Sequence, residues 1–134
     1  MRRLFSLEPI FCIALLCGCV SPPPPLSQEE LSTVGYGRFP DDYEKIIKDH
    51  FAKTLSEADS AQYRFGTPYS GYLQEGPLLG GKIQDAGYFV DVRIKAKARS
   101  GKYLAEKHVG VLIKNGEVLM EMTSEELGKV KRGQ

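Results

Sequence analysis

The stretch from Tyr88 to Met122 constrains the fold more than any other part of the chain. Between Tyr88 and Ala98, apolar or small residues occupy the even-numbered positions, and most of the odd-numbered positions between them are charged. A period of two is typical of a β-strand that buries one face. The even-numbered set is Tyr88, Val90, Val92, Ile94, Ala96 and Ala98. We therefore expect one buried and one solvated face.

Two turns fix the register of this stretch. Asn115-Gly116 predicts a two-residue type I′ hairpin, because both residues tolerate a positive φ. Ser100-Gly101 predicts an earlier two-residue turn in the same way. The first turn gives the pairs Lys114–Glu117, Ile113–Val118, Val111–Met120, Val109–Met122, Leu112–Leu119 and Gly110–Glu121. The second gives Val92–Val109, Val90–Val111, Tyr88–Ile113 and Lys95–Glu106.

Both turns place the apolar residues Val109, Val111 and Ile113 on one core face. A slip of one residue would turn that whole set to solvent, so the agreement supports the register. Ile94 would face Lys107. We therefore expect the sheet to extend beyond its apolar core there as a thin ribbon.

An amphipathic helix is predicted from Asp41 to about Ala58. Apolar residues recur at steps of three and four, and Asp41 with Glu44 fits a capping box. Two i,i+4 ion pairs are expected on its wet face, Glu44–Lys48 and Asp49–Lys53. We expect the helix to cover one face of the sheet, and the alternative is a helix that binds a partner.

The rest of the chain adds short strands and loops. Residues 62–65 and 69–73 predict two short strands, and the glycine-rich stretch 74–86 predicts a loop. Thr123 and Glu126 predict one helical turn, followed by a disordered basic tail. The predicted fold class is α+β, with one N-terminal amphipathic helix packed on an antiparallel sheet of about four strands.

Composition limits the function classes. The chain has 134 residues, room for one domain, with 18 basic and 17 acidic side chains. Removal of the first 18 residues would leave 16 of each, and this near-neutral charge argues against a nucleic-acid binder. All three cysteines lie within the first 19 residues, so we expect no disulfide and no thiol chemistry in the folded part.

The N-terminus predicts a targeting signal and a membrane anchor. Arg2 and Arg3 precede a mostly apolar segment that is shorter than a membrane span and ends in Leu16-Cys17-Gly18-Cys19. This ending resembles the lipobox of bacterial lipoproteins. The resemblance implies a signal peptide at 1–18 and a Cys19 that carries a diacylglycerol and an acylated amine. Val20 after the cysteine implies the outer membrane, with the domain on the periplasmic side. The alternative is an uncleaved signal anchor.

Residues 19–39 form the predicted lipidated start and tether. The run from Pro22 to Pro25 favours polyproline II and makes a semi-rigid spacer, with an SH3-type ligand as the alternative. The α+β domain is expected at 40–123 and the C-terminal tail at 124–134.

Several segments of the domain resemble a known group of proteins. The segments are 39–47, 55–65, Gly71-Tyr72 and 88–116. They are similar to a group of small bacterial outer-membrane lipoproteins that have no established activity. At the hairpin tip, where that group usually shows Asn-Ala-Lys-Asn and Gly-Gly-Tyr, this chain has Lys95-Ala96-Lys97-Ala98 and Gly101-Lys102-Tyr103. The resemblance implies an anchored domain and no reaction.

No catalytic, metal or cofactor set is predicted. Gly76 to Lys82 nearly matches a phosphate loop, but Ile83 stands where a Ser or Thr would hold magnesium. His108 is expected opposite Arg93, near Asp91, without a recognisable nucleophile or metal-ligand spacing. His50 is expected to be half-buried beside the helix.

Six basic residues give the best candidate site. They are expected along one face and the tip of a single hairpin: Arg93, Lys95, Lys97, Arg99, Lys102 and Lys107. One interpretation is a surface that binds anionic lipid headgroups, lipopolysaccharide, peptidoglycan carboxylates or an acidic protein. The other is a solvated face whose charge prevents edge-to-edge association of sheets.

The expected function is therefore that of a non-catalytic, periplasm-facing lipoprotein. It would act as an accessory or scaffold component of an outer-membrane or secretion assembly, with the membrane and an envelope protein as its partners. The alternative is a module that binds a small ligand or a cell-wall fragment in a concave aromatic pocket, using the tyrosine-rich strands and the glycine-rich loop.

Overall fold

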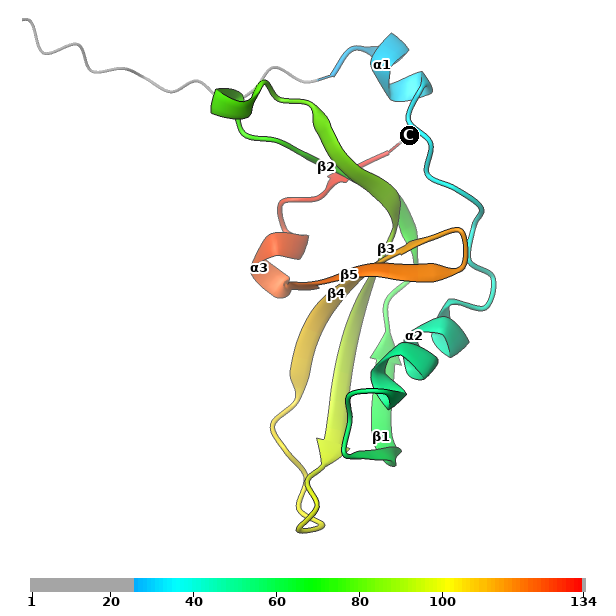
Figure 1. The fold of residues 1–134 in the computed structure, drawn as a ribbon, viewed down its shortest axis with the longest axis vertical. Coiled ribbons are helices and arrows are strands. Elements are labelled where there is room, and N and C mark those ends of the chain that lie inside the picture. The colour runs from blue at the N-terminus through cyan, green and yellow to red at the C-terminus, as the bar shows by residue number, and fades with distance from the viewer. Residues whose placement is uncertain (1–25, 134) are drawn as a thin grey trace, which may run out of the picture.

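The computed structural model describes residues 26–133 and has an α+β fold built on one six-stranded antiparallel sheet. Figure 1 shows how the elements are arranged. The predicted signal peptide, Cys19 and the proline run lie outside the described residues. The elements are α1 (Gln28–Ser32), α2 (Tyr43–Ala52), β1 (Glu57–Phe65), β2 (Tyr69–Gln74), the 3-10 helix η1 (Pro77–Leu79), β3 (Ile83–Lys97), β4 (Lys107–Lys114), β5 (Glu117–Thr123), α3 (Ser124–Leu127) and β6 (Lys131–Arg132).

The long strand β3 is the centre of the sheet. One of its edges pairs with β4 over Tyr88–Ile94. The other edge pairs first with β2, from Ile83 to Phe89, and then with β1, from Val92 to Lys97. Where the chain passes from β1 to β2, the Gly66 N–H donates to the Asp91 carbonyl at 2.7 Å. β3 thus has hydrogen-bonded neighbours along most of both edges.

β3 begins at Ile83, so the predicted start at Tyr88 and the predicted loop through Ala86 are wrong. Gly87, directly after the predicted loop, lies inside the strand, opposite Gly71. A Cβ at Gly87 would lie 2.7 Å from a Leu112 methyl and 2.8 Å from the Ile113 carbonyl oxygen. This glycine marks a close approach between strands, not a turn.

The first core lies between the sheet and α2, as predicted. Val92 faces Val109, Val90 faces Val111, and Tyr88 faces Ile113, which confirms the register of the β3–β4 hairpin. Ile47 and Phe51 of α2 cover this face. The buried residues of this first core are Ile47, Phe51, Val90, Val92, Ile94, Val109, Val111 and Ile113.

A second core lies on the opposite face and was not predicted. Phe89 and Leu112 are fully buried there together with Met122, under Leu127 of α3 and Val130. The central part of β3 therefore buries both faces, and the expectation of a single buried face is wrong for this part of the strand.

A β-bulge in β5 supplies the methionines of the second core. The pairs Lys114–Glu117 and Ile113–Val118 are confirmed, but the register then shifts by one residue. Leu112 faces Met120 and Gly110 faces Met122, so the predicted pairs beyond Val118 are wrong. The extra residue, Leu119, is half exposed. The shift turns Met120 and Met122 toward Phe89 and Leu112, because a second apolar face is there to receive them.

The helices differ from the prediction in length and number. α2 ends at Ala52, six residues early, and residues 57–65 form β1, of which only 62–65 was predicted. The Asp41–Glu44 capping box does not form, and an ion pair on α2 joins Lys45 to Asp49 at 2.6 Å.

Both ends of the described chain are more ordered than expected. α1 lies within the predicted tether and begins with a capping box of Ser27 and Glu30. The predicted helical turn after Thr123 is confirmed as α3, with its Thr123–Glu126 capping box. In place of a disordered tail, β6 pairs with β2.

The two-sided core predicts unequal roles for Leu112 and Leu119. Leu112→Ala should lower the free energy of unfolding by about 2–5 kcal/mol, because it opens a cavity in the second core. Leu119→Ala should cost about 0.5 kcal/mol or less, since the bulge leaves this side chain half exposed. Urea unfolding of the two variants measures the difference. Equal costs, or a larger cost at Leu119, would contradict the bulged register.

Candidate functional site

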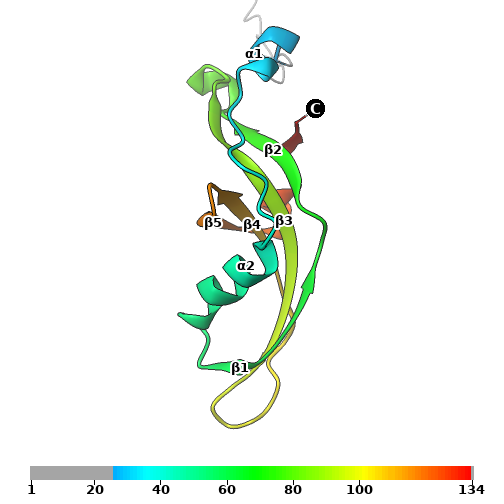
Figure 2. The same cartoon turned by 90° about the vertical axis from the view of Figure 1, so that its right-hand side faces the viewer.

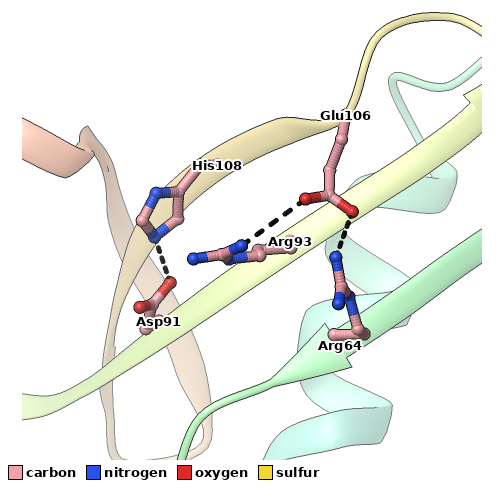
Figure 3. A network of polar contacts seen from close by, with 5 residues as sticks. All are labelled: Arg64, Asp91, Arg93, Glu106 and His108. Atoms are coloured by element: carbon pink, nitrogen blue, oxygen red, sulfur yellow. Dashed lines mark hydrogen bonds and ion pairs between the residues drawn. The ribbon is translucent and has the colours of Figure 1, made fainter.

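The face of the sheet opposite α2 carries the second core at the centre of β3, and it is polar along the second half of that strand. Side chains from β1, from β3 and from the chain around the start of β4 project from it into solvent, and we call this set the polar face. Figure 3 shows its central part. The ion-paired side chains there are between 35% and 69% exposed. The polar face consists of Gln62, Arg64, Asp91, Arg93, Lys95, Glu106 and His108.

Two arginines share one carboxylate at the centre of the polar face. Arg64 and Arg93 lie opposite each other across β1 and β3, where their like charges would repel. Arg64 donates to Glu106 Oε2 at 2.6 Å, and the guanidinium of Arg93 lies 3.7 Å from Oε1. The hydrogen bond from Arg64 lowers the pKa of Glu106 below its ordinary value. Glu106 therefore holds the two cations side by side.

His108 lies beside this trio. It faces Arg93 as predicted, and its Nε2 lies 2.5 Å from Asp91 Oδ1. Within residues 26–133, no serine or threonine hydroxyl is hydrogen-bonded to His108, and no cysteine occurs there. Nor does that part of the chain hold a cluster of three or more metal-ligating side chains.

His50 has a structural contact on the other face of the sheet. It lies on α2, half-buried as expected, and its Nε2 is 2.7 Å from Glu121 Oε1 of β5. The contact ties the helix to the edge of the sheet.

At the hairpin tip, two lysine ammonium groups lie over the ring of Tyr103. The Ala98 N–H donates to the Lys102 carbonyl at 2.9 Å, and Gly101 has φ 83°, so residues 99–101 form a three-residue loop, not the predicted two-residue Ser100-Gly101 turn. The ammonium groups of Lys95 and Lys97 lie 5.3 and 5.0 Å from the centre of the Tyr103 ring.

The structure brings five of the six predicted basic residues together. Arg93, Lys95 and Lys97 lie on the same side of β3, and Arg99 and Lys102 are exposed at the tip. Arg64 joins them from β1. We call this set the basic surface: Arg64, Arg93, Lys95, Lys97, Arg99 and Lys102. Four acidic residues lie among or beside them: Glu57 opposite Lys97, Asp59 in the same strand, Asp91 and Glu106.

Lys107 does not belong to the basic surface, so its prediction is wrong. It pairs with Ile94 on the helix-covered side of the sheet. Its ammonium lies 5.8 Å from the centre of the Phe51 ring and 3.8 Å from Glu121 Oε2. Alternation alone places it there, because odd positions of β4 face α2.

Arg64 was missed by the sequence prediction. Its alternation with Tyr63 and Phe65 correctly predicts a strand, but nothing local shows that this strand pairs with the second half of β3.

The tyrosines do not build one aromatic pocket. Tyr63 stacks on Phe65 at the first core, whereas Tyr69 stacks on Phe89 at the second, on the opposite face. Tyr72 is buried. A hollow of about 240 Å³ beside His108 is lined by polar side chains such as Glu121 and Glu126 together with Met122. The glycine-rich loop joins two strands through a 3-10 turn, without the strand-to-helix context of a phosphate loop.

Comparison with protein-family models, curated proteins and solved structures found no match to this chain. Among the helices of residues 26–133, none has the length and apolar character needed to cross a bilayer. The candidate site therefore rests on geometry and charge.

The shared carboxylate predicts a graded response to loss of each arginine. Arg64→Gln should raise the pKa of Glu106 toward its ordinary value, because it removes the short hydrogen bond. Arg93→Gln is the matched control and should raise it less, since that contact is 3.7 Å long. An NMR titration of the Glu106 side chain measures both.

The sign of the pH dependence follows from the lowered pKa. The Arg64–Glu106 contact should stabilise the fold above the unfolded-state pKa of Glu106 and lose its effect as the pH falls through the folded-state value. If Arg93→Gln raised the pKa of Glu106 as much as Arg64→Gln or more, Arg64 would not be the main partner of Glu106.

Proposed function

We propose that this chain is a non-catalytic lipoprotein of the bacterial outer membrane, facing the periplasm. It serves as an accessory or scaffold component of a cell-envelope assembly and contacts an acidic partner protein through the basic surface. The observation that carries the proposal is the exposed basic surface, in which six cations outnumber the four carboxylates that lie among or beside them, those of Glu57, Asp59, Asp91 and Glu106.

The position of the basic surface favours a partner away from the anchoring bilayer. α1 lies at one end of the elongated domain, and the β3–β4 hairpin tip lies at the other (Figures 1 and 2). β3 has 15 residues, and at about 3.3 Å per residue it spans roughly 45–50 Å. The screening length at physiological salt is only about 8 Å. Headgroups near a lipidated Cys19 would thus exert little attraction on the tip.

The tether keeps the near end of the domain close to the bilayer. Seven residue-to-residue steps join Cys19 to Leu26 and reach at most about 25 Å when fully extended. The tether limits this distance, and it does not by itself set the tilt of the domain.

The chemistry of the surface suits carboxylates on a protein. Arg64 and Arg93 offer planar guanidinium groups that bind carboxylates in a bidentate manner. Tyr103 adds an amphipathic ring between Lys95 and Lys97. A pocket for a small ligand draws no support from the tyrosines, because they are divided between two faces of the sheet.

Charge reversal at the hairpin should weaken partner capture. A variant with Lys95→Glu, Lys97→Glu and Arg99→Glu should recover at least about tenfold less of the partner from crosslinked native membranes, because like charges now face the acidic surface. Higher salt should weaken capture by the unaltered protein in the same direction. Quantitative mass spectrometry of the pull-down measures the loss.

A matched control carries the same change of charge elsewhere. Lys48→Glu, Lys53→Glu and Lys129→Glu alter three exposed lysines outside the basic surface and should leave capture unchanged. Equal loss in both variants, or no reproducible partner for the unaltered protein, would overturn the proposal.

A further inference from the structure

The loop between β2 and β3 exposes an apolar tip. Leu78 and Leu79 have 91% and 72% of their surface exposed. Glycine and proline surround them from Gly76 to Gly81, so no side chain in this tip is charged or polar. We call residues 76–81 the apolar loop. Among the described residues, these two leucines are the most exposed of the large apolar side chains.

Part of the backbone of the apolar loop is hydrogen-bonded within the loop. The N–H groups of Leu79 and Gly81 donate to the Gly76 carbonyl at 2.9 and 3.3 Å, and Gly80 donates to the Pro77 carbonyl at 3.4 Å. Pro77 brings no N–H. At the base of the loop, the Glu75 N–H donates to the Lys82 carbonyl at 2.8 Å. Because unpaired backbone groups are what makes irregular chain costly outside water, these hydrogen bonds lower the cost of moving the loop out of water, and the carbonyl groups of Leu78 and Leu79 still need the polar headgroup layer.

The apolar loop lies at the end of the domain where the tether enters. Figures 1 and 2 both show η1 beside the start of the described chain and opposite the basic hairpin tip. The chain at 33–35 and the start of β3 at 83–86 line a common hollow of about 320 Å³, which confirms that the incoming chain runs next to the base of this loop.

We propose that the apolar loop inserts into the interfacial layer of the bilayer that holds the acylated Cys19. Leu78 and Leu79 enter among the acyl chains, and the charged groups of Glu75 and Lys82 at the base stay at the headgroups. The inference rests on the proposed lipid anchor. An anchor and a loop give two contacts instead of one, so they restrict the tilt of the domain and direct the basic surface away from the bilayer.

A single thiol in the loop tests this proposal. In the processed protein Cys12 and Cys17 are gone and Cys19 is acylated, so Leu79→Cys supplies the only free thiol. An environment-sensitive fluorophore is attached there in lipidated protein reconstituted into phosphatidylethanolamine–phosphatidylglycerol vesicles. Ser100→Cys, at the opposite hairpin tip, is the matched control, and Leu78→Cys is a second loop position.

The expected result is opposite behaviour at the two ends of the domain. Brominated acyl chains should quench the label at residue 79 or 78 at least about threefold more than the label at residue 100. Aqueous iodide should show the reverse order.

Each contrary outcome has its own meaning. Loop labels as open to iodide as the label at residue 100, in protein whose Cys19 is acylated, would overturn the loop insertion and leave the anchor standing. Loop labels shielded from iodide but insensitive to brominated lipid would show a protein contact, such as a second copy, and would also overturn it. An unacylated Cys19 would remove both proposals.

Discussion

The pairing of β3 on both edges determines the rest of the structure. Strands β4, β2 and β1 take up its backbone hydrogen bonds, so its side chains are left to alternate between two faces. What covers each face then decides the character of each part of the strand. At the centre, Val90 meets α2 and Phe89 meets the segment around α3, and both side chains are fully buried. Further along, only one face is covered, and Arg93 and Lys95 face solvent.

The basic surface is a consequence of this uneven cover. α3 and Val130 reach Phe89 and Leu112 but not the second half of β3. In that half, α2 alone supplies an apolar layer, and the opposite face is free to carry charge without a desolvation cost. Glu106 then allows Arg64 and Arg93 to lie opposite each other, because it binds both.

Sequence reasoning succeeds where the information is local. The alternation from Val90 to Ile94 fixes which side chains point inward, and the Asn115-Gly116 turn brings Ile113 opposite Val118. These are properties of neighbouring residues and of hairpins with short loops. The same alternation also places Lys107 on the covered face, which an assignment by charge alone overlooks.

The sequence cannot show which distant segments meet. The pairing of Arg64 with Arg93 joins strands about thirty residues apart, and no turn between them dictates it. The bulge at Leu119 depends on the second core, which forms only when Leu127 and Val130 pack on Phe89 and Leu112. Gly87 looks like a loop residue until Leu112 is placed against it.

The two ends of the domain have opposite chemistry, and β3 holds them apart. One end presents an apolar loop beside the tether, and the other presents cations around Tyr103. If the chain is anchored as proposed, its charged end faces the periplasm. There the basic surface would be open to an acidic protein of an envelope assembly.

The anchor is the claim on which this account depends most. Intact-mass spectrometry of the protein extracted from native outer membranes tests it directly. The account predicts a mature chain that begins at Cys19 and carries a diacylglycerol and an amide-linked acyl chain. A chain with an unmodified Cys19 that still begins at Met1 would contradict it.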